Sequence, residues 1–152
     1  MKTLARPRDK AEIVRRLKEI RPESSRRWGR MTAHQMICHL SDSFRMVLGE
    51  KPVSPVAGPF PRTIVKWVAL YLPVTWPAGI PTMSEIDQGR GGTLPGDFTL
   101  DVARLEALLD FVASEPRSFP WPSHPLFGRM SDAAWLRWGY LHMDHHLRQF
   151  SA

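Results

Sequence analysis

The prolines and glycines of this chain gather in three stretches, and this distribution limits what the chain can fold into. Most of the 14 prolines and 10 glycines lie around residues 49–62, 73–96 and 116–128. Proline interrupts a helix because it lacks an N–H and its ring clashes with the preceding turn, and glycine weakens a helix by its conformational freedom. The three clusters are therefore predicted connections, and the segments outside them are free to form helices.

Four of these segments have the apolar spacing of amphipathic helices. Signals for helix ends agree with that spacing, since Thr32-Ala-His-Gln35 fits a capping box, Ser131 can cap a helix, and Pro22 and Pro116 each follow an apolar run. The sequence predicts main helices over Asp9–Ile20, Thr32–Gly49, Thr99–Ser114 and Ser131–Phe150.

A fifth apolar segment, Pro61 to Leu72, is predicted to form a short helix lying across the others. It is too uniformly apolar for a free surface helix, and Arg62 and Lys66 supply too little positive charge for a helix at a membrane surface. We expect it to be buried against the bundle or a dimer partner. Because strand patterns are weak throughout, the predicted fold class is all-α, a four-helix bundle with an extra short helix between the second and third main helices.

The length and composition fit a single globular domain over residues 1–152. Of these residues 43% are hydrophobic and 24% charged, as in ordinary globular proteins. The one cysteine, Cys38, cannot form an internal disulfide and is expected to be a buried, inert thiol, and no apolar signal segment follows Met1. The longest apolar run, Trp67 to Pro77, is too short to span a membrane. We expect a cytoplasmic protein.

The positive charge is concentrated at the amino-terminal end. The formal net charge is +6, and residues 1–30 hold eleven of the 21 Lys and Arg residues but only four acidic ones. A nucleic-acid surface using Arg15, Arg16, Arg26 and Arg27 would have this charge pattern, but no nucleic-acid-binding motif accompanies it. We therefore expect a solvated basic face and no nucleic-acid partner.

Two of the six histidines have the spacing of metal ligands. His142 and His146 lie four residues apart on the last predicted helix, so both imidazoles project from one face, close enough to reach one ion at about 2.0–2.1 Å. That face also carries Trp135 and Gly139, so the pair should point into the core. The chain lacks the Glu of HExxH, which argues against a zincin-type protease. A hydrogen-bonded pair of core histidines is the open alternative.

His39 provides a third candidate ligand. It lies at the inner edge of the second predicted helix, and bundles build metal sites from histidines on facing helices in this way. Three imidazoles leave a fourth coordination position open, as in catalytic rather than structural zinc sites. By the same helical projection, His34 falls on the polar face and is expected to be solvated.

Two motifs carry a resemblance to a known family. The segment CHLSDSF (38–44) on an early helix, together with LHMDHHLRQF (141–150) on the last one, resembles the DinB/YfiT-like family of metalloenzymes. HPLFGRMSDAAW (124–135), leading into HMDHHLRQF, looks like a bacterial subfamily of that group. The likeness extends over residues 8–150. It implies a four-helix bundle, often dimeric, with a divalent metal held by His39, His142 and His146.

Five further residues are candidates for supporting roles. Asp42 and Gln149 could orient a ligand imidazole or remain simple polar groups, and His145 could act as a nearby base, a substitute ligand or a packed histidine. His124 and Trp135 could line a pocket, although a place in the core is the simpler alternative for both. The segment 60–97 departs from the minimal family pattern and could cap the open end of the site.

The leading functional hypothesis is a metal-dependent enzyme with a three-histidine site that holds Zn²⁺ or Ni²⁺. The resemblance implies a thiol-dependent transferase or a hydrolase, a small-molecule substrate such as a low-molecular-weight thiol, and a homodimer. The alternative is a non-catalytic metal-binding or stress-associated protein-interaction module.

Overall fold

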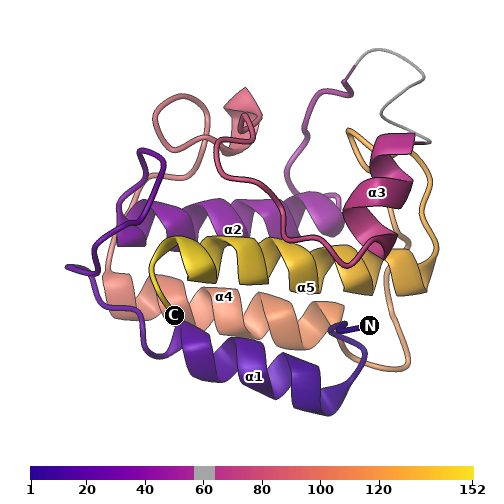
Figure 1. Ribbon diagram of the computed structural model, residues 1–152, viewed down its shortest axis with the longest axis horizontal. Helices are drawn as coiled ribbons and strands as arrows, with labels where there is room; N and C mark the ends of the chain where they lie inside the picture. The colour runs from indigo at the N-terminus through magenta and orange to yellow at the C-terminus, as the bar shows by residue number, and fades with distance from the viewer. Residues whose placement is uncertain (57–63) are drawn as a thin grey trace.

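The computed structural model describes residues 1–56 and 64–152 (Figure 1). In these residues the regular secondary structure consists of helices. They are α1 (Pro7–Leu17), α2 (Ala33–Val47), α3 (Lys66–Tyr71), α4 (Phe98–Val112) and α5 (Asp132–Gln149), with a 3₁₀ turn, η2 (Ser84–Ile86). No described helix is both long and apolar enough to cross a bilayer. The all-α class predicted from the sequence is confirmed.

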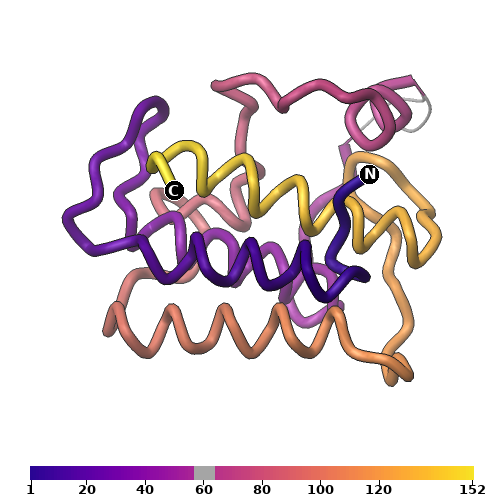
Figure 2. The backbone as a smooth tube through the Cα atoms, turned by 60° about the horizontal axis from the view of Figure 1, so that its bottom comes forward, coloured from indigo at the N-terminus to yellow at the C-terminus, as the bar shows by residue number. Residues whose placement is uncertain are grey.

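The four long helices lie side by side as a bundle (Figures 1 and 2). Helix α2 packs on α4, α1 packs on α5, and α2 also contacts α5. Outside this bundle α3 lies against α5, and η2 lies against α2. The predicted four-helix bundle with one extra short helix is therefore confirmed.

The capping residues explain where three of the helices begin. The Thr32 side chain accepts a hydrogen bond from the Gln35 N–H, and the Gln35 side chain accepts one from the Thr32 N–H, which completes the predicted capping box. Ser131 caps α5 as predicted. Helix α4 starts at Phe98, one residue before the predicted start, because Asp97 accepts a hydrogen bond from the Leu100 N–H.

Helix α1 ends at Leu17, three residues before its predicted end. The N–H groups of Glu19 and Ile20 bond to the carbonyl oxygens of Arg16 and Leu17, each at 3.1 Å. These bonds span three residues, so the last turn tightens instead of continuing as an α-helix. Ile20 is nevertheless buried, which accounts for its place in the apolar pattern.

Helix α3 lies within the predicted short helix, and several of its apolar side chains are exposed on the single chain. It covers Lys66–Tyr71, and residues 61–63 of the predicted helix lie outside the described residues. Leu70 is fully buried, but Trp67 is 58% exposed. Because α3 touches the bundle along one side only, burial against the bundle is limited mainly to Leu70.

Close packing around Gly139 joins α5 to α2 and to the amino-terminal segment. A Cβ atom at this position would lie 2.7 Å from Cδ1 of Leu4 and 3.4 Å from Cε1 of Phe44. Glycine therefore allows an approach that any other residue would obstruct. The surrounding core is formed by fully buried side chains of the four long helices, among them Ile13, Leu17, Met36, Leu40, Leu105, Leu109 and Met143.

The middle of α2 is buried on every side. Residues 36–44 are all buried, including the polar Ser41, Asp42 and Ser43. Helices α4 and α5 cover two sides of α2, and the segment around η2 covers a third. A helix with an apparently amphipathic sequence is thus enclosed, and His39 lies in the middle of it.

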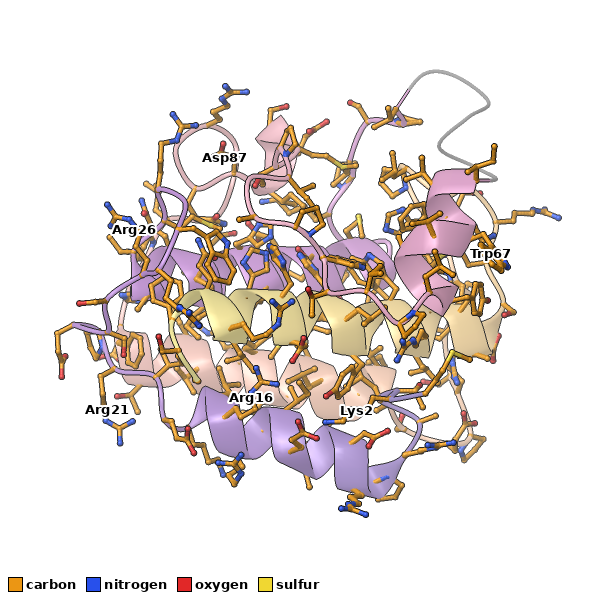
Figure 3. All side chains as sticks on the ribbon, in the orientation of Figure 1. Lys2, Arg16, Arg21, Arg26, Trp67 and Asp87 are labelled. Atoms are coloured by element: carbon orange, nitrogen blue, oxygen red, sulfur yellow. The ribbon has the colours of Figure 1, made fainter. Side chains whose placement is uncertain are left out.

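One arginine of the basic amino-terminal end is a structural residue. Arg16 is 8% exposed, and its guanidinium donates to Asp144 of α5 at 2.7 Å and to the carbonyl oxygen of Ala152 at 2.8 Å (Figure 3). These bonds connect α1 to α5 and to the carboxyl-terminal end. Arg16 therefore does not belong to the solvated face expected for this segment.

Candidate metal centre

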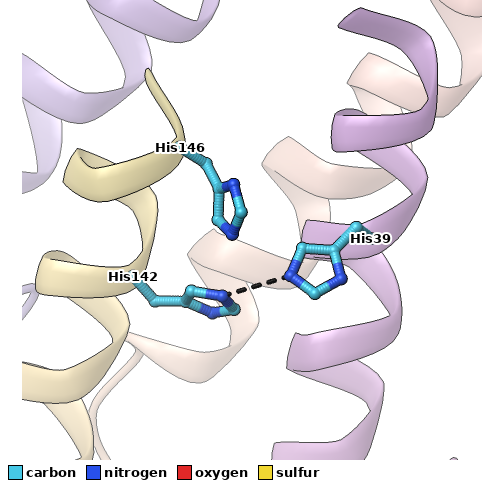
Figure 4. Close-up of side chains that lie close together, drawn as sticks. All are labelled: His39, His142 and His146. Carbon is cyan, nitrogen blue, oxygen red and sulfur yellow. Dashed lines mark hydrogen bonds between the residues drawn. The ribbon is translucent and has the colours of Figure 1, made fainter. Parts of the chain in front are cut away.

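Three histidines from two helices converge in the bundle (Figure 4). His39 comes from α2, and His142 and His146 lie one turn apart on α5. Their exposed fractions are 3%, 8% and 7%, and the centres of the three rings are 4.7–5.2 Å apart. The predicted orientation of the α5 pair toward the core and the predicted approach of His39 are both present in the structure.

The inward-facing ring nitrogens have the spacing of ligands to one ion. The Nε2 atoms of His39 and His142 are 3.3 Å apart, and one nitrogen from each of the three rings lies within 4.8 Å of the others. Two ligands about 2.0–2.1 Å from a tetrahedral ion are about 3.3–3.4 Å apart. The group could therefore hold a metal ion after small side-chain rotations.

The outer nitrogens of two rings are held by oxygen acceptors. Nδ1 of His39 is 2.8 Å from the carbonyl oxygen of Ile86, and Nδ1 of His146 is 3.0 Å from Oε1 of Gln149. An oxygen acceptor requires the proton to be on Nδ1, so in the neutral rings the Nε2 lone pairs of His39 and His146 are free. Both lone pairs face the centre, as in histidine ligands of metals.

The orientation of the Gln149 amide follows from its second contact. Its Nε2 donates to the carbonyl oxygen of Trp28 at 2.8 Å, and a carbonyl oxygen can only accept. The amide oxygen must therefore face His146. Gln149 is buried, with an exposed fraction of 2%. Through its two contacts it connects the loop at Trp28 to His146.

His142 is held by aromatic contacts instead of a hydrogen bond on its outer nitrogen. Its ring centre lies 4.8 Å from that of Trp138 and 6.1 Å from that of Trp76. Its Nδ1 is buried and has no hydrogen-bond partner among the described residues. The orientation of this ring is therefore set by packing.

Burial keeps the three imidazoles neutral. Loss of hydration lowers the pKa of His39 and lowers the pKa values of His142 and His146 well below their usual value. For His142 the neighbouring histidines lower the pKa further. Neutral imidazole is the form that binds a metal ion, so this environment suits ligation.

Hydrogen bonding among the three rings cannot satisfy all their inner nitrogens. With the protons of His39 and His146 on Nδ1, only His142 can direct an N–H to the centre, and it can donate to His39. This leaves Nε2 of His146 without a donor among the three rings, and within the described part of the chain Nδ1 of His142 is unpaired. A cation would accept three lone pairs at once, so the donor set fits a metal better than a hydrogen-bonded core.

A pocket of about 310 Å³ reaches His146 from outside. Its wall includes His145, His146 and Gln149 from α5, and Arg30, Asp87 and Arg90 from the loops above them. A volume of this size suits a small molecule. Of the three histidines, His146 therefore borders the pocket, while His39 and His142 lie behind it.

The other predicted site residues lie in different surroundings, and only some of them are near the three histidines. His145 lines the pocket beside His146, their ring centres 5.0 Å apart. Asp42 has no hydrogen bond to a histidine within the described residues, and instead binds Thr93 and Gln88. Trp135 is 1% exposed and packs in the core between Trp121 and Trp138.

His124 does not line the pocket at His146 and lines a different hollow together with Lys66. Its Nδ1 accepts hydrogen bonds from the N–H groups of Leu126 and Phe127, at 3.1 and 3.2 Å. His124 therefore holds the turn that precedes α5, and this turn is closed by two backbone bonds between His124 and Gly128.

A second group of possible ligands connects α2 to α4. His34 Nε2 lies 2.8 Å from Oδ2 of Asp101, and Cys38 Sγ lies 3.8 Å from the same atom. The carboxylate also accepts hydrogen bonds from Gly96 and Arg104, so it already has its partners. His34 is therefore part of a polar contact between helices and is not solvated as expected.

The Cys38 thiol of this second group is protonated. Burial and the nearby Asp101 carboxylate raise its pKa to about 11. Cys38 is 3% exposed, which agrees with the prediction of a buried, inert thiol.

Sequence reasoning missed the groups that orient the histidines. Ile86 acts through its backbone oxygen, and Trp28 acts in the same way on Gln149. A backbone carbonyl carries no signal in residue type, so no motif could have indicated these contacts. The rings of Trp76 and Trp138 give a weak signal, since both are large aromatic residues in segments next to the site.

An all-helical bundle with three converging buried histidines defines this chain as a protein with a candidate metal centre. The chain belongs to a family described as "Protein of unknown function (DUF1569)", which matches residues 6–152. No curated protein and no solved structure matches this chain. The family match spans all the helices and both segments that supply the histidines.

Proposed function

We propose that this DUF1569 protein is a metal-dependent enzyme of the DinB/YfiT-like type, in which His39, His142 and His146 bind a divalent cation, Zn²⁺ or Ni²⁺. The observation that carries the proposal is the convergence of ring nitrogens whose protons are held on the outer side. Imidazole ligands suit both of these ions. The same three positions were inferred from helical spacing and from the family resemblance.

A cation in this place would supply Lewis-acid chemistry, which lowers the pKa of water or of a thiol that reaches the open position. The chain itself would orient the three nitrogens through Ile86, Gln149 and Trp138. His145 and Asp87 line the same pocket, and either could accept a proton from an entering thiol or water. We infer a thiol-dependent transferase or a hydrolase that acts on a small molecule.

The pocket favours an enzyme over a structural metal site. A structural site encloses its ion with four protein ligands, whereas His39, His142 and His146 are the only group of described residues placed around this centre. A pocket of about 310 Å³ leads to His146. This combination of three ligands and access from outside supports a reacting fourth position.

The test is elemental analysis of the purified, untagged protein for Zn, Ni, Fe, Mn and Cu. The His39→Ala variant removes one proposed ligand, and His124→Asn is the matched control because His124 is equally buried but lies outside the centre. We expect about one metal ion per chain in the unchanged protein and in the control, and little metal in His39→Ala.

The outcome decides between a metal centre and a packed core. Metal retained by the His39→Ala variant would contradict the ligand assignment. Absence of metal from the unchanged protein, even after Zn²⁺ or Ni²⁺ is added back, would mean that the histidines are core residues and would favour a binding module.

A further inference from the structure

The charge of the proposed centre is not balanced by its own ligands. This inference rests on the proposed function, that is, on a divalent cation bound by three histidines. An imidazole binds a metal ion as a neutral ligand, so the three rings contribute no negative charge. A divalent ion held by neutral ligands keeps its full charge in a site poor in water, which attracts an anion.

The walls of the pocket add more positive charge. Arg30 precedes α2 and Arg90 follows η2, and both line the pocket that reaches His146. Asp87 lines it too, and its carboxylate is 4.0 Å from Nε of Arg90. The ion pairs formed by the described residues do not include Arg30. One carboxylate therefore faces two guanidinium groups and the cation.

Arg30 and Arg90 line two adjoining pockets. A second pocket, of about 260 Å³, adjoins the first and is lined by Arg30, Asp87 and Arg90 together with Gln35 and Gln88. A ligand in either pocket therefore lies against walls that include both arginines. Arginine binds carboxylate and phosphate oxygens in pairs, which fixes the orientation of a small ligand.

We propose that the small molecule that reacts at this centre carries an oxyanion group, a carboxylate or a phosphate, which Arg30 and Arg90 bind while its reactive end lies at the histidine centre. The arginines are specificity-determining residues in this arrangement. Neutral and cationic molecules of the same size lack this contact, so they bind less tightly.

Cobalt-substituted protein provides a test that does not need a known reaction. Co²⁺ bound by three imidazoles absorbs visible light, and a thiolate that joins it adds an intense sulfur-to-metal band. We would titrate the Co²⁺ protein with three thiols of similar size, namely 3-mercaptopropionate, 2-mercaptoethanol and cysteamine. The affinity of 3-mercaptopropionate should exceed that of 2-mercaptoethanol by about tenfold, and cysteamine should bind least.

Arginine variants test whether the preference for 3-mercaptopropionate comes from Arg30 and Arg90. The double variant Arg30→Gln, Arg90→Gln should bind 3-mercaptopropionate and 2-mercaptoethanol equally. Arg27→Gln is the control, because it removes one guanidinium from the loop that also holds Arg30, at a residue that lines neither pocket. It should keep the preference. Competition by inorganic phosphate or by acetate identifies which oxyanion the arginines prefer.

The failure of this inference is distinct from failure of the proposed function. Equal binding of the three thiols by the unchanged Co²⁺ protein, or a preference that survives in the double variant, would overturn the anionic ligand and leave the metal centre standing. Absence of bound Co²⁺ by elemental analysis would overturn the proposed function and this inference with it.

Discussion

The three histidines of the centre differ in what holds their outer nitrogens. A backbone oxygen holds His39, a side-chain amide holds His146, and indole rings pack around His142. A substitution cannot remove the backbone oxygen and would disturb the core if it removed an indole. Gln149 is therefore the residue at which the orientation of one ligand can be tested without changing a ligand.

Replacing Gln149 with leucine should weaken metal binding about 10- to 100-fold, because His146 would lose the acceptor that fixes its ring and its proton. Competition with a coloured chelator measures this affinity. Thermal unfolding of the metal-free variant serves as the control for folding, since the change also removes the bond to Trp28. A folded Gln149→Leu protein with unchanged affinity would show that the amide does not orient the ligand.

His124 is a buried histidine that cannot accept a second proton without losing contacts. Its Nδ1 already accepts two backbone N–H groups, so a proton there would face two donors. Burial, with a smaller contribution from Lys66, lowers its pKa to about 3. Since an unfolded histidine has a pKa of about 6.5, acid protonates His124 in the unfolded chain first.

This difference predicts how stability depends on pH. Above about pH 6.5 both states are neutral at His124, and below it the free energy of unfolding should fall by about 1.4 kcal/mol per pH unit until the folded pKa is reached. In His124→Asn, the amide oxygen can still accept the two N–H groups, so this part of the slope should disappear. Urea unfolding of both proteins between pH 7 and pH 4 gives the free energy of unfolding as a function of pH. Parallel curves for the two proteins would refute the predicted contribution of His124.

At the scale of elements, the segment 84–93 is as important to the centre as the helices. It supplies the Ile86 oxygen to His39, and it is held in place by Asp42 of α2. This carboxylate accepts hydrogen bonds from the Thr93 N–H and hydroxyl, both at 2.7 Å, and from Nε2 of Gln88 at 3.2 Å. Asp42 therefore acts on the histidine through the loop.

The Asp42→Asn substitution keeps the shape of the side chain but removes its charge and one acceptor. We expect the free energy of unfolding to fall by about 1.5–3 kcal/mol, because bonds to a buried carboxylate are lost. Metal affinity should fall as well. Denaturant unfolding and chelator competition give the two values.

Asp110→Asn is the matched control for this substitution. Asp110 pairs with Lys10 at 2.9 Å, but its side chain is 67% exposed, so removal of its charge should change stability by less than about 1 kcal/mol. An Asp42→Asn protein that is less stable but binds metal as before would show that anchoring of the loop does not reach His39.

At the scale of the whole molecule, α3 is the place where apolar surface is left uncovered. Ile64, Val65, Trp67, Val68 and Tyr71 are all exposed, although Leu70 on the same segment is fully buried. Exposed apolar patches of this kind are common at protein interfaces. This agrees with the homodimer expected from the sequence, which stays a prediction.

Size-exclusion chromatography with light scattering should give about twice the chain mass of 17.4 kDa. Trp67→Glu should shift the protein toward the monomer, because a charge on α3 would have to be desolvated in the interface. Leu94→Glu is the control, since Leu94 is an exposed apolar residue outside α3. A monomer in the unchanged protein at high concentration would contradict the prediction.

The sequence by itself determined the helices and the proposed ligand set, because both depend on periodicity and local chemistry. The capping residues Thr32 and Ser131 each act on the N–H group three residues away, so their effect can be read without a fold. His142 and His146 share a face by helical geometry alone. The predicted ends were less accurate, as at α1, because tightened turns depend on carbonyl bonds that residue type does not indicate.

Only the tertiary structure decided what surrounds these residues. His34 falls on the polar face of a helical projection, yet Asp101 of α4 contacts it, and the segment 84–93 covers Asp42. The Ile86 oxygen on His39 and the exposure of α3 likewise depend on how distant segments pack. Helical periodicity shows which residues share a face, but burial and hydrogen bonding also depend on what covers that face, and this is set by contacts far apart in the sequence.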